Sequence, residues 1–452
     1  MSMENLPSSL LLEILSRLTD STDLARCRLV SKTLNTVSHD IRSVTLFCSM
    51  SRYLKSRSPE TKHLVTPFKT VFTDLVRRSR NIDTVSLGVD RALGTVSFDD
   101  VEDECDDLYL TDLSFFKEWL PLICEGLKSL TVSDFWVQSC WRRSDALSLI
   151  SSSCCTLVKL VIRNAWLSVD SLNSMPTLTN LTLEFVRLDD EDLSRISSCF
   201  PNLIELNLIG VGGLKEPKIN LLHLRTCHWS VSNAPLSLII CAPNLVDFHL
   251  KCIKPRLIVL EAPLLYTFNL SLENTDELNL KNCTNIECLQ LNIECLSLGF
   301  LCSMFRHCST VKRLTVDLVR KNDQVEVTEF GLDTLLDFFP NISYLNLGPG
   351  PWFVMESSFC KGGLKESIGM KTLKELVAHL VVHEIESTLA FLFCILGKCM
   401  KCSDVYVLIH RDVDSYVAGN LISTCRSKFP RVKWRWGIWK EGIKDTLVSD
   451  GI

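Results

Sequence analysis

The sequence predicts an α/β protein: a short N-terminal module of three helices, followed by a solenoid with a parallel β-sheet on its concave face. Two observations predict this organisation. Apolar residues recur at helical spacing within the first 40 residues, and a short apolar phrase recurs from about residue 127 onward. A chain of 452 residues is long enough to build an extended repeat array.

The first predicted helix carries a broad apolar stripe on one side. Pro7 suits its opening turn, because a proline there loses no hydrogen bond. Asp20 or Ser21 can cap a second helix, and Ser31 a third. So short a module encloses too little interior to bury the whole stripe. It must therefore pack on the rest of the chain or contact another polypeptide. The stripe consists of Leu10, Leu11, Ile14, Leu15 and Leu18.

Residues within and around the stripe follow one another in this order: Leu6-Pro7, Ile14-Leu15, Leu18, Asp23-Leu24, Arg26 and Val30-Ser31-Lys32. In this order they resemble an F-box, the trihelical module by which proteins dock on the adaptor of SCF-type cullin ubiquitin ligases. Ser9 stands where the family usually has an acidic residue, and Leu34 where it usually has an aromatic one. These two departures imply weaker docking but not its loss.

The resemblance assigns residues 1–42 to an F-box. It implies that the adaptor is contacted by Leu6, Pro7, Leu10, Leu11, Ile14, Leu15, Leu18, Leu24, Val30, Ser31 and Lys32.

The recurring phrase is an apolar residue, two others, an apolar residue, one other and a last apolar residue. Clear examples are Leu178-Leu181-Leu183 and Leu203-Leu206-Leu208, which start 25 residues apart. In a strand the last two apolar residues point to the same face, here the interior of the solenoid. The next clear phrase starts at Leu245, so the gap leaves room for a hidden unit at residues 221–224.

These phrases resemble leucine-rich repeats, and behind an F-box they are similar to plant F-box/leucine-rich-repeat proteins. We assign residues 127–367 to the repeats and residues 43–126 to a connecting region with irregular first repeats. Residues 189–199 and 332–339 are predicted to be outer helices, whereas the compressed repeats of 240–300 leave room only for short loops. Residues 368–452 resemble, weakly, an FBD-type segment, and are predicted to cap the last repeat.

The candidate target-binding residues lie between the two apolar positions of each predicted strand, on the concave face. None of them is formally charged at neutral pH, which favours a hydrogen-bonding groove for a peptide or protein surface over one for nucleic acid. An alternative is that amides at exposed strand positions simply stack as ladders. The column contains Val161, Thr182, Asn207, His249, Asn269, Asn279, Gln290, Ser297, Thr315 and Asn346.

Composition excludes several classes of protein. The net charge is −5, from 48 basic and 53 acidic residues, so no global positive field attracts nucleic acid. No apolar run approaches the ~20 residues of a membrane span, and no secretory signal is evident, so we expect cytoplasmic or nuclear residence. The 21 cysteines are then expected to be reduced thiols. The acidic residues between 99 and 107 are interpreted as a solvated loop.

No pattern indicates catalysis, a metal or a cofactor. Cys399 and Cys402 have the Cys-x-x-Cys spacing without a second pair, and His379 and His383 lie in a segment that is more typical of a strand than of a helix. We therefore predict a non-enzymatic substrate receptor that binds the adaptor of a cullin ligase and an unknown target protein. The alternative is an interaction scaffold whose N-terminal helices only cap its own first repeat.

Overall fold

The computed structural model describes residues 6–18, 20–96, 106–231, 235–273, 275–293, 308–318, 331–363, 370–441 and, for the backbone alone, 443–448. Its contacts divide the chain into two compact units, residues 1–233 and 234–452, which we describe separately. Within the described residues, no helix is both long enough and apolar enough to cross a membrane.

The first unit begins with three helices, α1 (Ser8–Ser16), α2 (Ser21–Val30) and α3 (Lys32–Ser38). The predicted caps are present: the side chains of Asp20 and Ser31 accept hydrogen bonds from the backbone N–H groups of Thr22 and Thr33. The three helices enclose a core of their own, formed by Leu11, Leu15, Leu24, Leu34, Val37 and Ile41.

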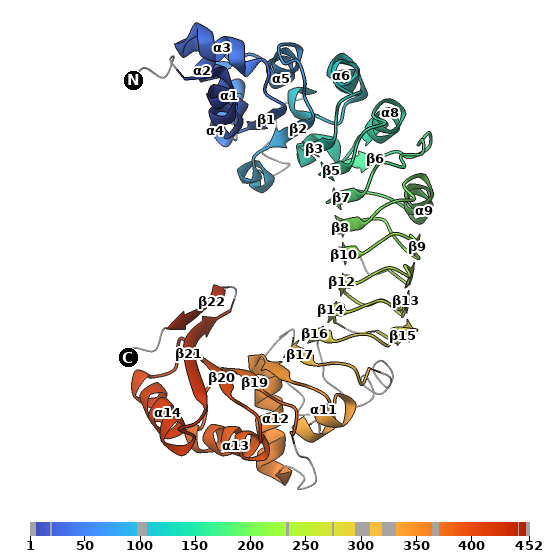
Figure 1. The fold of residues 1–452 in the computed structure, drawn as a ribbon. Helices are drawn as coiled ribbons and strands as arrows, with labels where there is room; N and C mark the ends of the chain where they lie inside the picture. Colours follow the sequence, from blue (N-terminus) through green and yellow to red (C-terminus); the bar gives the residue numbers. More distant parts are fainter. Residues whose placement is uncertain are drawn as a thin grey trace. The chain divides into compact units, whose positions relative to one another are not determined.

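Parallel strands follow the helices, and their central apolar residues lie in register. Leu160 pairs with Leu181 and Leu181 with Leu206, and all three are buried. The hidden repeat exists, since β10 follows the buried Leu224. The sheet order in this unit is β1 (Ser43–Cys48), β2 (Thr84–Val89), β3 (Ser129–Ser133), β5 (Lys159–Arg163), β7 (Asn180–Glu184), β8 (Glu205–Val211) and β10 (Thr226–Val231) (Figure 1).

The outer segments of the first unit are mostly helices, as expected for residues 189–199, where Asp189 and Asp192 form a reciprocal capping box. The helices are α4 (Met50–Arg57), α5 (Phe68–Arg77), α6 (Leu113–Trp119), α7 (Trp136–Ser139), α8 (Ala146–Ser153) and α9 (Asp190–Cys199). Short 3-10 turns cover Lys62–Leu64, Arg91–Thr95, Asp106–Leu108 and Leu120–Leu122. The remaining strands are β4 (Arg143–Ser144), β6 (Trp166–Leu167) and β9 (Lys218–Asn220).

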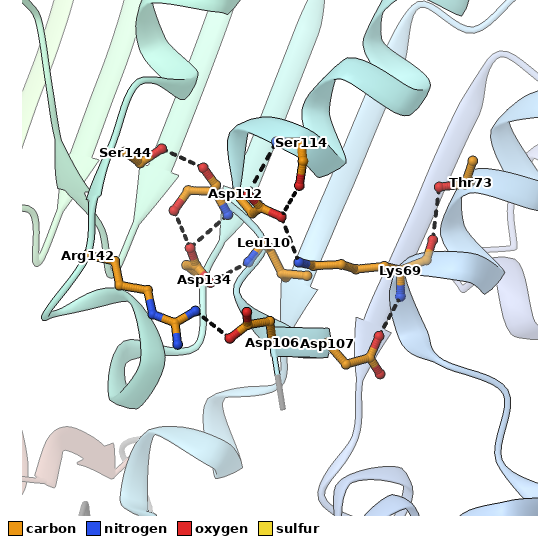
Figure 2. Close-up of polar contacts among 11 residues, drawn as sticks. Lys69, Thr73, Asp106, Asp107, Leu110, Asp112, Ser114, Asp134, Arg142 and Ser144 are labelled. Atoms are coloured by element: carbon orange, nitrogen blue, oxygen red, sulfur yellow. Dashed lines mark hydrogen bonds and ion pairs between the residues drawn. The ribbon is translucent and has the colours of Figure 1, made fainter. Parts of the chain in front are cut away.

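Asp134, at the end of β3, is a fully buried carboxylate that holds the preceding segment in place. It accepts hydrogen bonds from the N–H groups of Leu110, Thr111 and Phe135 at 2.7, 2.8 and 2.8 Å, and from the Thr111 hydroxyl. Figure 2 shows the contact with Leu110. Burial raises the pKa of Asp134 to about 6, and these hydrogen bonds oppose the rise.

The acidic run was interpreted as a solvated loop, and most of it, residues 97–105, lies outside the described residues. Its last two members are not simply solvated. Asp107 accepts hydrogen bonds from the backbone N–H groups of Phe68 and Lys69 at the start of α5. Figure 2 shows the contact of Asp107 with Lys69 and the pairing of Asp106 with Arg142. A carboxylate at a helix N-terminus satisfies donors that the helix itself leaves unpaired.

The second unit has the same plan. Its main sheet runs in the order β12 (Asp247–Cys252), β14 (Thr267–Leu272), β16 (Cys288–Ile293), β17 (Arg313–Leu318), β18 (Tyr344–Leu347), β19 (Glu375–Leu380), β20 (Asp404–His410), β21 (Lys433–Lys440) and β22 (Ile443–Val448). All neighbours are parallel except β22, which lies antiparallel on β21. The helices are α11 (Leu332–Phe338), α12 (Pro349–Gly362), α13 (Ile385–Lys398) and α14 (Ser415–Lys428) (Figure 1).

The outer segments of residues 237–281 correct the expectation of short loops. They are strands, β11 (Ser237–Cys241), β13 (Leu257–Glu261) and β15 (Glu277–Lys281), paired in parallel as a second sheet. Leu238, Ile240, Ile258 and Leu260 alternate toward the interior and are buried. A repeat of about 20 residues leaves too few residues on the outer side for a helix, but enough for a short strand with alternating apolar residues.

The predicted order of N-terminal helices followed by strand repeats on a parallel sheet is confirmed. The C-terminal region continues this alternation as β19, α13, β20, α14 and β21, and the antiparallel β22 pairs with β21. β22 thereby covers the edge of β21, to which a further parallel repeat would otherwise add.

Candidate protein-binding surfaces

The apolar stripe of α1 is divided between two environments. Leu11 and Leu15 are buried in the core of the helical module. On the other side of α1, Leu10 and Ile14 are 46% and 41% exposed. Because successive residues of a helix lie about 100° apart, a stripe this broad cannot face a single neighbour.

The predicted adaptor-contact residues therefore separate into groups. Leu11, Leu15, Leu24 and Ser31 are buried, which corrects their placement on a contact surface: they join the helices to one another instead. Leu6 and Leu18 are half-buried against the same core. Leu34, at the position where the family has an aromatic residue, is part of that core as well. The exposed members are Pro7, Leu10, Ile14, Val30 and Lys32.

One exposed residue was missed by the sequence analysis. Leu29 is 89% exposed beside Val30, which is 78% exposed, at the end of α2. The available signal was a pair of adjacent apolar residues at the end of α2, directly after Arg28. We call Leu10, Ile14, Leu29 and Val30 the exposed apolar set of the module.

Within the first unit, Thr182 and Asn207 face each other across β7 and β8 as predicted, and Asn207 Nδ2 lies 3.2 Å from Thr182 Oγ1. His228, from the hidden repeat, pairs next with Asn207 and was missed. Val161 precedes Thr182 in the same row but is buried, which corrects its expected exposure.

The second unit contains a longer row of the predicted residues. His249, Asn269, Gln290, Thr315 and Asn346 pair in succession across five neighbouring strands. Asn269 Nδ2 lies 2.8 Å from His249 Nδ1, so part of the row is held by hydrogen bonds within it. Such bonds favour the ladder interpretation for this pair.

Two predicted members are not in this row. Asn279 lies in β15 of the outer sheet, paired with Val259, so its placement on the concave face was wrong. Leu278 and Leu280 alternate around Asn279 as apolar residues do in both inner and outer strands, so the pattern alone could not show to which sheet the strand belongs. Ser297 lies outside the described residues.

The row continues into residues that the sequence analysis did not include. Val377, Tyr406 and Arg435 follow Asn346 in register. Val377 forms an apolar cluster with Leu408 and Trp439. Tyr344 and Tyr406 pack against this cluster. The Arg435 guanidinium lies 4.8 Å from the Tyr406 ring centroid, and the Arg313 guanidinium 3.9 Å from that of Tyr344. The row thus changes from neutral amides to aromatic and cationic groups.

The two histidines considered for metal binding make separate contacts. His379 lies in β19 as expected, with Nδ1 3.2 Å from the Leu347 carbonyl oxygen, whereas His383 lies beyond the strand and its ring packs on Phe353. Among the described residues no three His, Cys, Asp or Glu side chains could jointly hold a metal ion.

The thiols of the Cys-x-x-Cys pair lie in a largely buried environment. Burial raises the pKa of Cys399 to about 12 and that of Cys402 to about 11, so both are protonated thiols at neutral pH. Cys399 Sγ lies 3.3 Å from Met370 Sδ. Cys399 and Cys402 are both free thiols.

A trihelical module in front of strand repeats defines a protein with an F-box and leucine-rich repeats, and comparisons with known proteins agree. An F-box-like family model matches residues 3–44. An F-box/LRR-repeat protein of Arabidopsis thaliana is 48% identical over 451 residues, which cover 99% of this chain and 100% of that relative. The chain therefore belongs to the F-box/LRR-repeat family, whose members are typically non-catalytic adaptors.

Proposed function

We propose that this chain is the substrate-recognition subunit of an SCF-type cullin-RING ubiquitin ligase. In this proposal the helical module docks on the adaptor subunit, and the open face of the strand repeats binds a target protein. The observation that carries the proposal is the exposed apolar set of the module, Leu10, Ile14, Leu29 and Val30. Apolar groups that a small module leaves exposed are typical of a surface that another protein covers.

The chain accelerates ubiquitin transfer by proximity and performs no bond-making step. Binding the adaptor and the target on one polypeptide raises the effective concentration of target lysines near the charged conjugating enzyme. This role needs neither a cofactor nor a metal. It is compatible with the free cysteines and with residence in the cytoplasm or nucleus.

The target-binding residues that we propose lie on the open face of each unit. Thr182 and Asn207 belong to the first unit, and the row from His249 to Asn346 to the second. Amide and hydroxyl groups suit the backbone and polar side chains of a protein surface. The net charge of −5 argues against a nucleic-acid partner.

Adaptor co-purification tests the proposal. The full chain carrying both Ile14→Asp and Val30→Asp is co-expressed with a Skp1-type adaptor, and we expect the adaptor to be lost from the purified complex. Leu64→Asp is the control, because Leu64 is an exposed apolar residue of the first unit outside the helical module. Retained binding by the double variant would remove the basis of the assignment.

One observation favours the alternative, a scaffold whose helices cap its own first repeat. The Ser21 hydroxyl accepts a hydrogen bond from the Thr45 N–H at 2.9 Å, so α2 contacts β1. Deleting residues 1–41 separates the two functions. A receptor should remain soluble and folded without its module, whereas a scaffold that depends on the cap should aggregate.

A further inference from the structure

The first unit contains a cavity of about 1120 Å³ that the proposed function does not yet use. Its lining comes from the carboxyl ends of β1, β2, β3, β5 and β7 and from the segments that follow them. The carboxyl edge of a parallel sheet is where α/β proteins commonly bind ligands, because successive loops converge there.

Two phenylalanine rings of this cavity lie on glycines that make room for them. A Cβ on Gly210 would lie 2.5 Å from Cδ1 of Phe185, and a Cβ on Gly88 would lie 3.1 Å from Cε1 of Phe47. Phe185 is 61% exposed. Its backbone is in the left-handed region with φ +52°, where its N–H donates to the Ile209 carbonyl at 2.7 Å.

A large apolar residue rarely adopts positive φ, and such backbone conformations cluster at functional sites. Asn164, on the same lining, is also left-handed with φ +56°. Its Nδ2 donates to the Asp134 carbonyl at 3.2 Å, and its carbonyl accepts the Ser139 hydroxyl. The cavity wall is therefore held in an unfavourable conformation by specific contacts, and it presents an aromatic ring to solvent.

The charged groups of the cavity are positioned as well. Arg163 Nε donates to Glu184 Oε2 at 2.5 Å, and the Arg187 guanidinium lies 4.6 Å from the Trp166 ring centroid. Arg91 is exposed on the same lining. The lining thus contains three arginines and two carboxylates, those of Asp90 and Glu184. The net positive charge beside aromatic rings complements a ligand that carries both a carboxylate and an apolar group.

We propose that this cavity binds a short peptide segment of a target protein, in which an acidic residue lies close to an aromatic or aliphatic one. The inference rests on the proposed role as a target receptor and names the chemistry of one contact. The volume exceeds the roughly 300–1000 Å³ of typical small-molecule pockets.

Selection from a phage library of random 12-residue peptides tests this proposal with the immobilised full chain. We expect the enriched peptides to share Asp or Glu within about three residues of Trp, Phe or Leu. The most enriched peptide is then synthesised with a fluorophore, and its Kd is measured by anisotropy. Phe185→Ala and Arg187→Ala should each weaken binding about tenfold, as aromatic and arginine contacts often do.

Two further variants sharpen the result. Gly210→Ala removes no side chain of the cavity, but its Cβ would displace the Phe185 ring and its backbone, at φ +62°, disfavours alanine, so it should weaken binding as Phe185→Ala does. Lys218→Ala removes an exposed charge outside the cavity and should leave the Kd unchanged.

The proposal is overturned if no peptide is enriched, if the enriched peptides lack acidic residues, or if a single-stranded RNA 12-mer competes at the same site. It is also overturned if the cavity variants bind as well as the wild type. All these variants should still co-purify with the adaptor. Failure of the peptide assay therefore differs from failure of the ligase assignment.

Discussion

The helical module and the strand repeats of the first unit differ in which side chains they expose and which they bury. The module leaves apolar groups exposed, with Leu29 and Val30 as the extreme cases. The repeats bury even a carboxylate, that of Asp134, and surround it with hydrogen-bond donors. A buried polar group that finds hydrogen-bond donors within the chain, as Asp134 does, stabilises the fold from inside. Exposed apolar groups such as Leu29 and Val30 are typical of a surface that another protein covers.

The largest effect expected from this comparison distinguishes two adjacent residues of α1. Leu15→Asp places a charge in the module core and should destabilise the module by about 4 kcal/mol, because a buried unpaired carboxylate is so costly. Hydrogen exchange should show loss of protection throughout residues 8–38. Ile14→Asp, at the neighbouring exposed position, should keep that protection while lowering adaptor binding. Equal exchange in the two variants would contradict the division of the stripe.

The second prediction concerns the buried carboxylate of the repeats. Because burial raises the pKa of Asp134 to about 6, the folded chain binds its proton more tightly than the unfolded chain does. The free energy of unfolding should therefore decrease as the pH rises from about 4 to about 6, by up to about 3 kcal/mol, and level off above that. Urea midpoints measured across this range provide the test.

The matched control for this titration is Asp134→Asn. It keeps the shape of the side chain but cannot ionise, so its stability should lack this component of the pH dependence. Parallel curves for the variant and the wild type would show that other carboxyl groups, such as Asp192 with its raised pKa, cause the effect.

The helices and strands of this chain could be predicted because their signals are local. Asp20 and Ser31 cap helices where expected, and the hidden repeat at residues 221–224 follows from the period alone. The second sheet could not be predicted, since Leu278 and Leu280 of β15 alternate like any inner strand. Which sheet a strand joins depends on partners far away in the sequence.

The surfaces were less predictable than the fold. The sequence indicates an apolar stripe on α1 but does not show how the stripe divides. Leu11 and Leu15 face α2 and α3, whereas Leu10 and Ile14 remain exposed. The cavity left almost no signal, because its residues follow strand ends, where no period applies. Phe185 is the clearest example, because a phenylalanine side chain gives no indication that the backbone is left-handed at that position.

A third prediction tests how closely the repeats are packed. A Cβ on Gly88 would lie 2.6 Å from Ser133 Cβ and 2.9 Å from Ser133 O, so the neighbouring strand would have to shift. Gly88→Ala should therefore lower the free energy of unfolding by about 2 kcal/mol. Gly94→Ala is the control, because nothing lies within 4 Å of a Cβ there. If both variants unfold at the same urea concentration, the strands around Gly88 accommodate an added methyl group and are not closely packed there.

The smallest expected effect on stability lies at the exposed end of α2. Leu29→Ser and Val30→Ser remove apolar groups that contact little of the chain itself, so each should change the free energy of unfolding by less than about 0.5 kcal/mol. Adaptor affinity, measured by calorimetry, should nevertheless fall, because a partner that covers these side chains loses their burial. A stability loss without an affinity loss would mean that the module uses these residues for itself, and the contrast with the repeats would disappear.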